Sequence, residues 1–131
     1  MILLDTHVWL WWLYDDPKLP RGLRQYLTDH QYEQYAVSVV SYWEIAKLDE
    51  KKRIHLHLPL EAWTQETKSY PLLRILELTP KIAVRSTLLP DFPNRDPGDE
   101  LIVASALNYD LPLATCDRKL LQYKHVRCVA F

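Results

Sequence analysis

The chain has 131 residues, of which 48% are hydrophobic and 25% are charged, proportions typical of an ordinary globular protein. Its formal net charge of −1 gives no global electrostatic reason to bind nucleic acid, and no apolar run approaches the roughly 20 residues of a membrane span. The two cysteines have neither metal-binding nor redox spacing, which excludes a disulfide framework and fits a reducing cytoplasm. We therefore expect one cytoplasmic domain over residues 1–131, with no membrane segment.

Apolar runs, helix-start signals and prolines divide the chain into alternating strands and helices. In chain order, we predict a strand at 1–5, helices at 6–13 and 20–30, a strand at 35–40, helices at 41–51 and 59–69, a strand at 72–78, helices at 80–88 and 96–109, a strand at 111–116, a helix at 117–123 and a last strand at 126–131. This alternation predicts an α/β fold with a mostly parallel central sheet. Only two glycines occur, so the chain has no glycine-rich loop of the kind that binds nucleotides.

Acidic residues stand where the predicted strands end and the helices begin. There are five of them: Asp5, Glu44, Asp96, Asp99 and Asp117. Each one alone has an ordinary structural role, because carboxylates cap or stabilise the N-termini of helices. Glu44, for example, completes a capping box that begins at Ser41, and Asp96 followed by Pro97 is a strong helix start.

Taken together, the five acids predict a metal site. In a parallel α/β sheet the strand-to-helix junctions lie along one edge, so these carboxylates would converge on one cleft. They would repel one another there unless a cation held them, and Mg²⁺ and Mn²⁺ prefer such oxygen ligands. We therefore expect a metal-dependent enzyme acting on phosphate esters. No His or Lys is placed as a general base, so a water activated by the metal is the simplest nucleophile.

Four segments that contain these acids resemble the PIN-domain ribonucleases, and most closely the VapC-type toxins of bacterial toxin–antitoxin pairs. They are, in order, MILLDTHVWLWWL, SVVSYWEIAKL, RDPGDELIVASAL and PLATCDRKL. The resemblance extends from Met1 to about Val129. It implies a PIN-like three-layer α/β/α sandwich that hydrolyses RNA with Mg²⁺ or Mn²⁺. It also implies two partners, a helical antitoxin segment and a second copy of the chain in a homodimer.

The resemblance also implies which residues form the site. By motif position, the catalytic and metal-binding acids are Asp5, Glu44, Asp99 and Asp117. Three second-tier residues match positions that often line this pocket: Asp96, Thr6 and Thr115. The chain departs from the family pattern at Gly98, where a bulky apolar residue is usual, and at Glu100, where relatives usually carry Arg. We expect these departures to affect substrate affinity more than metal binding.

Three other functions are compatible with parts of the pattern. A haloacid-dehalogenase-type phosphatase also begins with a strand and an Asp, but it needs a second Asp where this chain has His7. A receiver domain needs a pair of acids near its first strand, and Asp5 has no acidic neighbour. The third alternative is a PIN-like fold that serves only as an interaction module. The complete set of acids argues against this alternative.

Three tryptophans lie within one predicted helix, at positions 9, 11 and 12. One face of a surface helix cannot bury all three side chains. We therefore expect at least one of them to be partly exposed and to contribute to a protein interface.

Overall fold

Four parallel strands form a central sheet in the computed structural model, which describes all 131 residues. They are β1 (Leu3–Leu4), β2 (Tyr35–Ser38), β3 (Leu73–Leu76) and β4 (Leu113–Ala114), and they lie in the order β3-β2-β1-β4. In the register of the sheet, Leu3 of β1 is paired with Ala36 on one side and with Leu113 on the other. Because β1 and β4 are neighbours, the ends of the chain's first and last strands come together in space.

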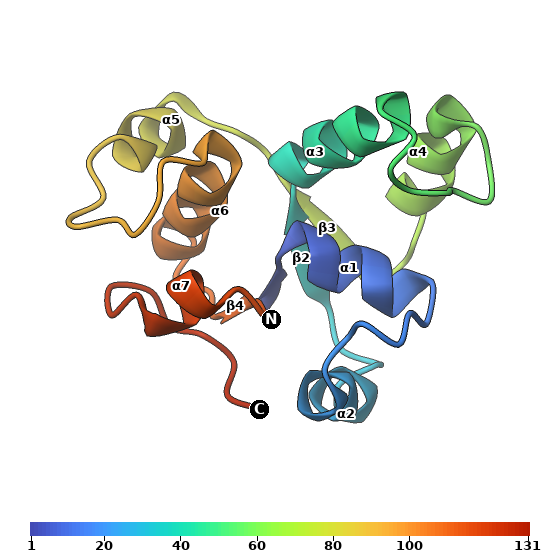
Figure 1. Cartoon of the computed structure of the whole chain (residues 1–131), viewed down its shortest axis with the longest axis horizontal. Helices are drawn as coiled ribbons and strands as arrows, with labels where there is room; N and C mark the ends of the chain where they lie inside the picture. The colour runs from blue at the N-terminus through green and yellow to red at the C-terminus, as the bar shows by residue number, and fades with distance from the viewer.

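Seven helices surround the sheet. They are α1 (Thr6–Leu13), α2 (Arg21–Asp29), α3 (Val39–Glu50), α4 (Leu60–Lys68), α5 (Pro80–Ser86), α6 (Pro97–Asn108) and α7 (Arg118–Gln122). Figure 1 shows α1, α2 and α4 on one side of the sheet and α5, α6 and α7 on the other. The predicted α/β/α sandwich with a mainly parallel sheet is therefore confirmed.

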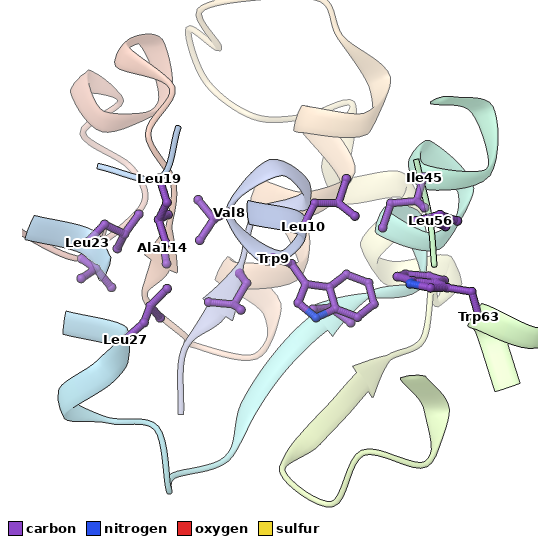
Figure 2. Packing of buried hydrophobic residues seen from close by; sticks show 13 residues of the cluster. Val8, Trp9, Leu10, Leu19, Leu23, Leu27, Ile45, Leu56, Trp63 and Ala114 are labelled. Atoms are coloured by element: carbon purple, nitrogen blue, oxygen red, sulfur yellow. The ribbon is translucent and has the colours of Figure 1, made fainter. Parts of the chain in front are cut away.

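The two layers of helices pack against opposite faces of the same short strands, because successive residues of a strand point to opposite sides. Leu4, Val37 and Ala114 belong to a cluster of 13 buried residues that also contains the buried side chains of α1, α2 and α4. Figure 2 shows this cluster, in which the rings of Trp9 and Trp63 lie 5.4 Å apart between their centroids. Leu3, Ala36 and Leu113 face the other way, into a cluster of 11 buried residues with α6 and α7.

The helix predicted at 41–51 and the strand predicted at 126–131 differ most from the structure, and the four observed strands are shorter than predicted. The third helix begins at Val39 rather than at Ser41, and its cap is Ser38, whose hydroxyl accepts a hydrogen bond from the backbone N–H of Val40 at 3.0 Å. Ser41 therefore lies inside the first turn and does not form the predicted capping box with Glu44. The predicted strand at 126–131 is reduced to a single bridge between Cys128 and Leu113. Its apolar residues Val126 and Val129 are buried, but the segment does not extend along β4.

The three clustered tryptophans are divided among different environments. Trp9 is fully buried, whereas Trp11 and Trp12 are each half-buried and face different cavities. The prediction that at least one of the three is partly exposed is confirmed, since both Trp11 and Trp12 are. Their role in a protein interface stays a prediction. None of the seven helices combines the length and hydropathy that crossing a bilayer requires.

Candidate functional site

One pocket of about 420 Å³ gathers all five acids that the sequence places at element ends. It lies where β1 and β4 end and where α6 begins, beside Glu44 in the second turn of α3. Its lining consists of Asp5, Thr6, His7, Trp11, Glu44, Asp96, Asp99, Cys116 and Asp117. The chain thus brings together residues that are separated by more than 110 positions, because β1 and β4 pair in the sheet.

Asp5 is held by hydrogen bonds to both of its carboxylate oxygens. As the cap of α1, its Oδ1 accepts from the backbone N–H of Thr6 at 2.9 Å. Its Oδ2 accepts from the hydroxyl of Thr115 at 2.7 Å, and Thr115 is fully buried just after β4. The same hydroxyl accepts from the backbone N–H of Asp117 at 3.1 Å. Thr115 therefore fixes the orientation of Asp5 relative to the turn that carries Asp117.

Glu44 is oriented by a chain of two hydroxyl groups. The hydroxyl of Thr6 donates to Oε1 of Glu44 at 2.6 Å, and it lies 2.8 Å from the hydroxyl of Ser41. An ionised carboxylate can only accept hydrogen bonds. The hydroxyl of Thr6 therefore donates its one proton to Glu44 and accepts a hydrogen bond from the hydroxyl of Ser41. Both hydroxyl residues are buried. Ser41 does not line the pocket but supports Glu44 through Thr6, a role that was not predicted. Its position three residues before Glu44 on the same helix was the available signal, because residues three apart share a helix face.

Asp96 and Asp99 open α6 and have different structural roles. Asp96 is the predicted cap, with Oδ1 accepting from the backbone N–H groups of Gly98 at 2.8 Å and Asp99 at 3.3 Å. The carboxylate of Asp99 is free of capping and points to the pocket. Its Oδ2 accepts from the side-chain amide of Asn94 at 3.0 Å, and the amide oxygen of Asn94 accepts from the backbone of Asp96.

Asn94, which holds Asp99, is not among the residues predicted for the site. Its place two residues before a capping Asp is the signature of an Asx turn, and that signature could have identified it.

Gly98 lets Glu44 approach the start of α6. A Cβ atom at this position would lie 2.6 Å from Oε2 of Glu44 and 3.2 Å from Oδ1 of Asp96. The departure from the bulky residue usual in the family thus leaves room for the carboxylate, and the helix start keeps its cap. Glu100, the other departure, is half-buried and is not among the residues that line the pocket.

The carboxylates of this pocket are electrostatically unbalanced, because no Lys or Arg is among the residues that line it. Burial and the negative charges of Asp5 and Asp96 raise the pKa of Asp99 to about 7. Burial also raises the pKa of Asp5, although the bonds from Thr115 and Thr6 oppose the shift. The pKa of Glu44 is raised by burial and then by Asp5 and Asp96, against the bond from Thr6. A bound cation would relieve this repulsion.

The donor set fits a hard divalent cation that keeps part of its water shell. No three His, Cys, Asp or Glu side chains come close enough to hold an ion between them alone. Mg²⁺ commonly binds through one or two carboxylates and retains several waters, so a closed cage of protein ligands is not required. Oxygen ligands also outnumber the softer donors His7 and Cys116 around this pocket. His57 lies outside this pocket, where its ring hydrogen-bonds to Tyr14 at 2.7 Å and to Glu66 at 2.7 Å.

Known proteins of one class are similar to this chain in sequence and in fold. The PIN domain family matches residues 2–126, so the chain belongs to the PIN-domain family. It is 34% identical to ribonuclease VapC22 of Mycobacterium tuberculosis over 128 residues, which cover 98% of this chain and 95% of that protein. The match excludes the phosphatase and receiver alternatives.

Solved structures support the same fold. A DNA-bound VapBC structure from Salmonella typhimurium superposes with a TM-score of 0.69 at 17% identity, covering 98% of each chain. A toxin–antitoxin complex from Klebsiella pneumoniae gives a TM-score of 0.68 at 21% identity, over 99% of this chain and 97% of that one. VapC20 of Mycobacterium tuberculosis, described as a toxin that cleaves the sarcin–ricin loop, gives 0.66 at 14% identity, over 97% and 99%.

Proposed function

We propose that this protein is a metal-dependent endoribonuclease that acts as the toxin of a toxin–antitoxin pair. The observation that carries the proposal is that Asp5, Glu44, Asp99 and Asp117 line one pocket that has no Lys or Arg side chain in its lining. Membership of the PIN-domain family and the similarity to a VapC ribonuclease support RNA as the substrate. Each of these four acids would contribute to holding Mg²⁺ or Mn²⁺, with Asp96 in a secondary place.

The proposed reaction is hydrolysis of an RNA phosphodiester bond. Mg²⁺ or Mn²⁺ held by Asp5, Glu44, Asp99 and Asp117 would lower the pKa of a water and offset the negative charge that develops on the scissile phosphate. The oxygen of the water bonds to phosphorus, the bond from phosphorus to O3′ breaks, and O3′ takes a proton. The products carry a 5′-phosphate and a 3′-hydroxyl.

The residues around the pocket keep its acids in fixed positions during this reaction. Thr115 and Thr6 hold Asp5, Thr6 also holds Glu44, and Asn94 holds Asp99. Catalytic groups that are already oriented avoid the cost of reorganisation at the transition state.

Cleavage of RNA by the purified protein tests the proposal directly. We expect cleavage with Mg²⁺ or Mn²⁺, none in EDTA, and a loss of at least about 100-fold in Asp5→Asn and Asp99→Asn. Asp29→Asn is the matched control, because Asp29 is an exposed residue at the end of α2 that lies outside the pocket and accepts a hydrogen bond from Gln25. Cleavage that persists in EDTA, or that is equal in Asp5→Asn and Asp29→Asn, contradicts the site. A correctly folded wild type that cleaves no RNA would instead favour the interaction-module alternative.

The proposed partners are an antitoxin and a second copy of the chain. Structures with the same fold are described as VapBC and FitAB complexes, some of them bound to DNA. We propose that an antitoxin helix covers part of the exposed surface around Trp11, and that residues 1–131 act as one domain in a homodimer. The two free cysteines agree with a cytoplasmic location. Co-expression with the product of a small adjacent gene, followed by co-purification, tests the antitoxin.

A further inference from the structure

A second groove opens directly beside the acidic pocket. It has a volume of about 370 Å³ and shares three lining residues with that pocket: His7, Glu44 and Asp96. The rest of its lining is different in chemistry, because it carries one aromatic, one apolar and three basic side chains: Trp43, Leu48, Lys47, Lys51 and Arg53. A ligand that extends out of the acidic pocket in this direction therefore passes onto a basic and aromatic surface.

Trp43 is the largest exposed side chain of this groove. It precedes Glu44 on α3, so the helix that aims Glu44 at the pocket also holds Trp43 at its rim. Its exposed fraction is 51%, whereas Trp9 and Trp63 are buried in the core. About half of this indole therefore remains available to a planar ligand.

Three cations beside Trp43 have no ionic partner. Lys47 and Lys51 follow Trp43 at intervals of four residues, which places them in one row along α3, and Arg53 comes just after the helix. All three are exposed, and the ion pairs of this structure are formed by other residues. The ammonium of Lys47 lies 6.0 Å from the centre of the Trp43 ring, at the outer limit of a cation–π contact. It can therefore turn to a nearby anion at little cost.

We propose that this groove holds a single-stranded segment of the RNA next to the scissile bond. One unpaired base stacks on Trp43, and adjacent phosphates lie against Lys47, Lys51 and Arg53. Exposed aromatic rings interleaved with cations are the arrangement that binds single-stranded nucleic acid, because every base has a face to stack and every linkage has a charge. A paired base cannot stack in this way, so the groove selects unpaired RNA.

The inference rests on the proposed nuclease function and deepens it, because the groove and the pocket share Glu44. RNA is favoured over a protein partner because the three cations have no ionic partner and lie in a row. This arrangement suits the RNA backbone, which carries one negative charge per nucleotide. Trp43 is then a positioning residue for the substrate. The acids of the pocket remain the groups proposed to act at the phosphate.

Binding of labelled oligonucleotides in EDTA tests the stacking. The probes are a fluorescein-labelled oligouridine of about ten nucleotides, an abasic chain of the same length and charge, and an RNA hairpin stem. We expect Trp43→Ala to weaken binding of oligouridine about tenfold and Trp43→Phe to retain most of it. Neither substitution should alter binding of the abasic chain or the stem. Tyr32→Ala, which removes an aromatic ring that is 85% exposed but lies outside the groove, is the matched control.

The cations are tested by salt dependence. For single-stranded RNA, each phosphate contact contributes about 0.7 to the slope of log affinity against log salt concentration. Lys47→Gln and Lys51→Gln should each reduce this slope by about that amount, whereas Lys81→Gln, an exposed lysine on α5, should leave it unchanged. In Mg²⁺, Trp43→Ala should raise KM for cleavage of oligouridine and leave kcat nearly unchanged, because the indole does not touch the reacting phosphate.

The outcomes separate this inference from the nuclease proposal. A wild type that cleaves RNA, with Trp43→Ala binding oligouridine as tightly as wild type, overturns the groove assignment alone. Equal weakening toward oligouridine and the abasic chain excludes stacking. Unchanged RNA binding with loss of binding to a co-expressed antitoxin would make the groove a protein interface and also overturn the assignment. A wild type that neither binds nor cleaves any RNA overturns both proposals.

Discussion

Gly98 and Glu44 occupy complementary space at the start of α6. A Cβ atom on Gly98 would lie 2.6 Å from Oε2 and 2.9 Å from Cδ of Glu44, distances that real Cβ contacts do not reach. The carboxylate is tied on its other side by the hydroxyl of Thr6 at 2.6 Å. A side chain at position 98 would therefore force Glu44 to give up either its place or its hydrogen bond.

Gly98→Ala should consequently reduce activity without reducing stability. Alanine favours a helix over glycine by up to about 1 kcal/mol, so the melting temperature should stay the same or rise. Displacement of Glu44 should lower kcat/KM for RNA cleavage by roughly 10- to 100-fold. Gly22→Ala, at the only other glycine, is the control, because the atoms nearest to its Cβ would belong to Phe131, far from Glu44 in the sequence and outside the pocket. Equal activity of the two variants would show that Glu44 tolerates the shift.

Thr115→Val should cost both stability and activity. It removes the donor to Asp5 and the acceptor for the backbone N–H of Asp117 while keeping the shape of the buried side chain. A lost hydrogen bond to a charged group costs about 1–3 kcal/mol, which urea unfolding can measure. Thr115→Ser keeps the hydroxyl and should keep most of the cleavage rate. If Thr115→Val cleaves RNA as fast as Thr115→Ser, the orientation of Asp5 does not limit the reaction.

Divalent cations should stabilise the folded protein. The acids of the pocket repel one another when it is empty, and a ligand that binds only the folded state adds stability as its concentration rises. The melting temperature should increase with the logarithm of free Mg²⁺ or Mn²⁺, and NaCl at equal ionic strength should not reproduce the increase. Asp5→Asn should lose most of this response and Asp29→Asn should keep it. An absent shift in the wild type would argue against a metal site.

The raised pKa of Asp99 predicts a pH dependence with a defined sign. Its pKa is about 7 in the folded protein and 3.8 in the unfolded chain, so the folded state binds more protons between these values. Stability of the metal-free protein should therefore fall as pH rises from about 4 to about 7. Asp99→Asn should weaken this fall and raise the metal-free melting temperature at pH 7, since Asp96 and not Asp99 caps α6. Urea unfolding of both proteins across this pH range is the test, and parallel curves would contradict it.

Substitutions of Trp11 and Trp12 should have different effects on antitoxin binding, although the two residues are adjacent in the sequence. Trp11 lines the acidic pocket, where its ring lies 5.5 Å from that of His7. Trp12 lines a cavity at the opposite edge of the sheet, with Met1 and Pro112. Trp11→Ser should weaken binding of a co-expressed antitoxin, and Trp12→Ser should leave that binding intact. For each variant, the mass in solution reports the oligomeric state and co-purification reports antitoxin binding. Unchanged assembly in both variants would show that neither ring belongs to an interface.

Much of the local structure could be predicted because it depends on near neighbours in the sequence. Asp5, Asp96 and Asp117 each cap the helix that follows them, through hydrogen bonds to residues one to three positions away. The cap of α3 is Ser38, three residues before the predicted cap Ser41, and both serines are possible caps. Local sequence does not choose between them. The choice follows from burial, since Ser41 is needed inside the helix to reach Thr6.

The sequence by itself determined the class of fold, the family and the set of acids, because element ends, apolar runs and motif spacing are local properties of the chain. Only the tertiary structure decided which side chains orient those acids. Thr115 reaches Asp5 across 110 residues and Thr6 reaches Glu44 across 38, and both contacts exist because β1 lies between β2 and β4. The order of strands is fixed by burial of both faces of the sheet at once, a long-range balance that no single segment encodes.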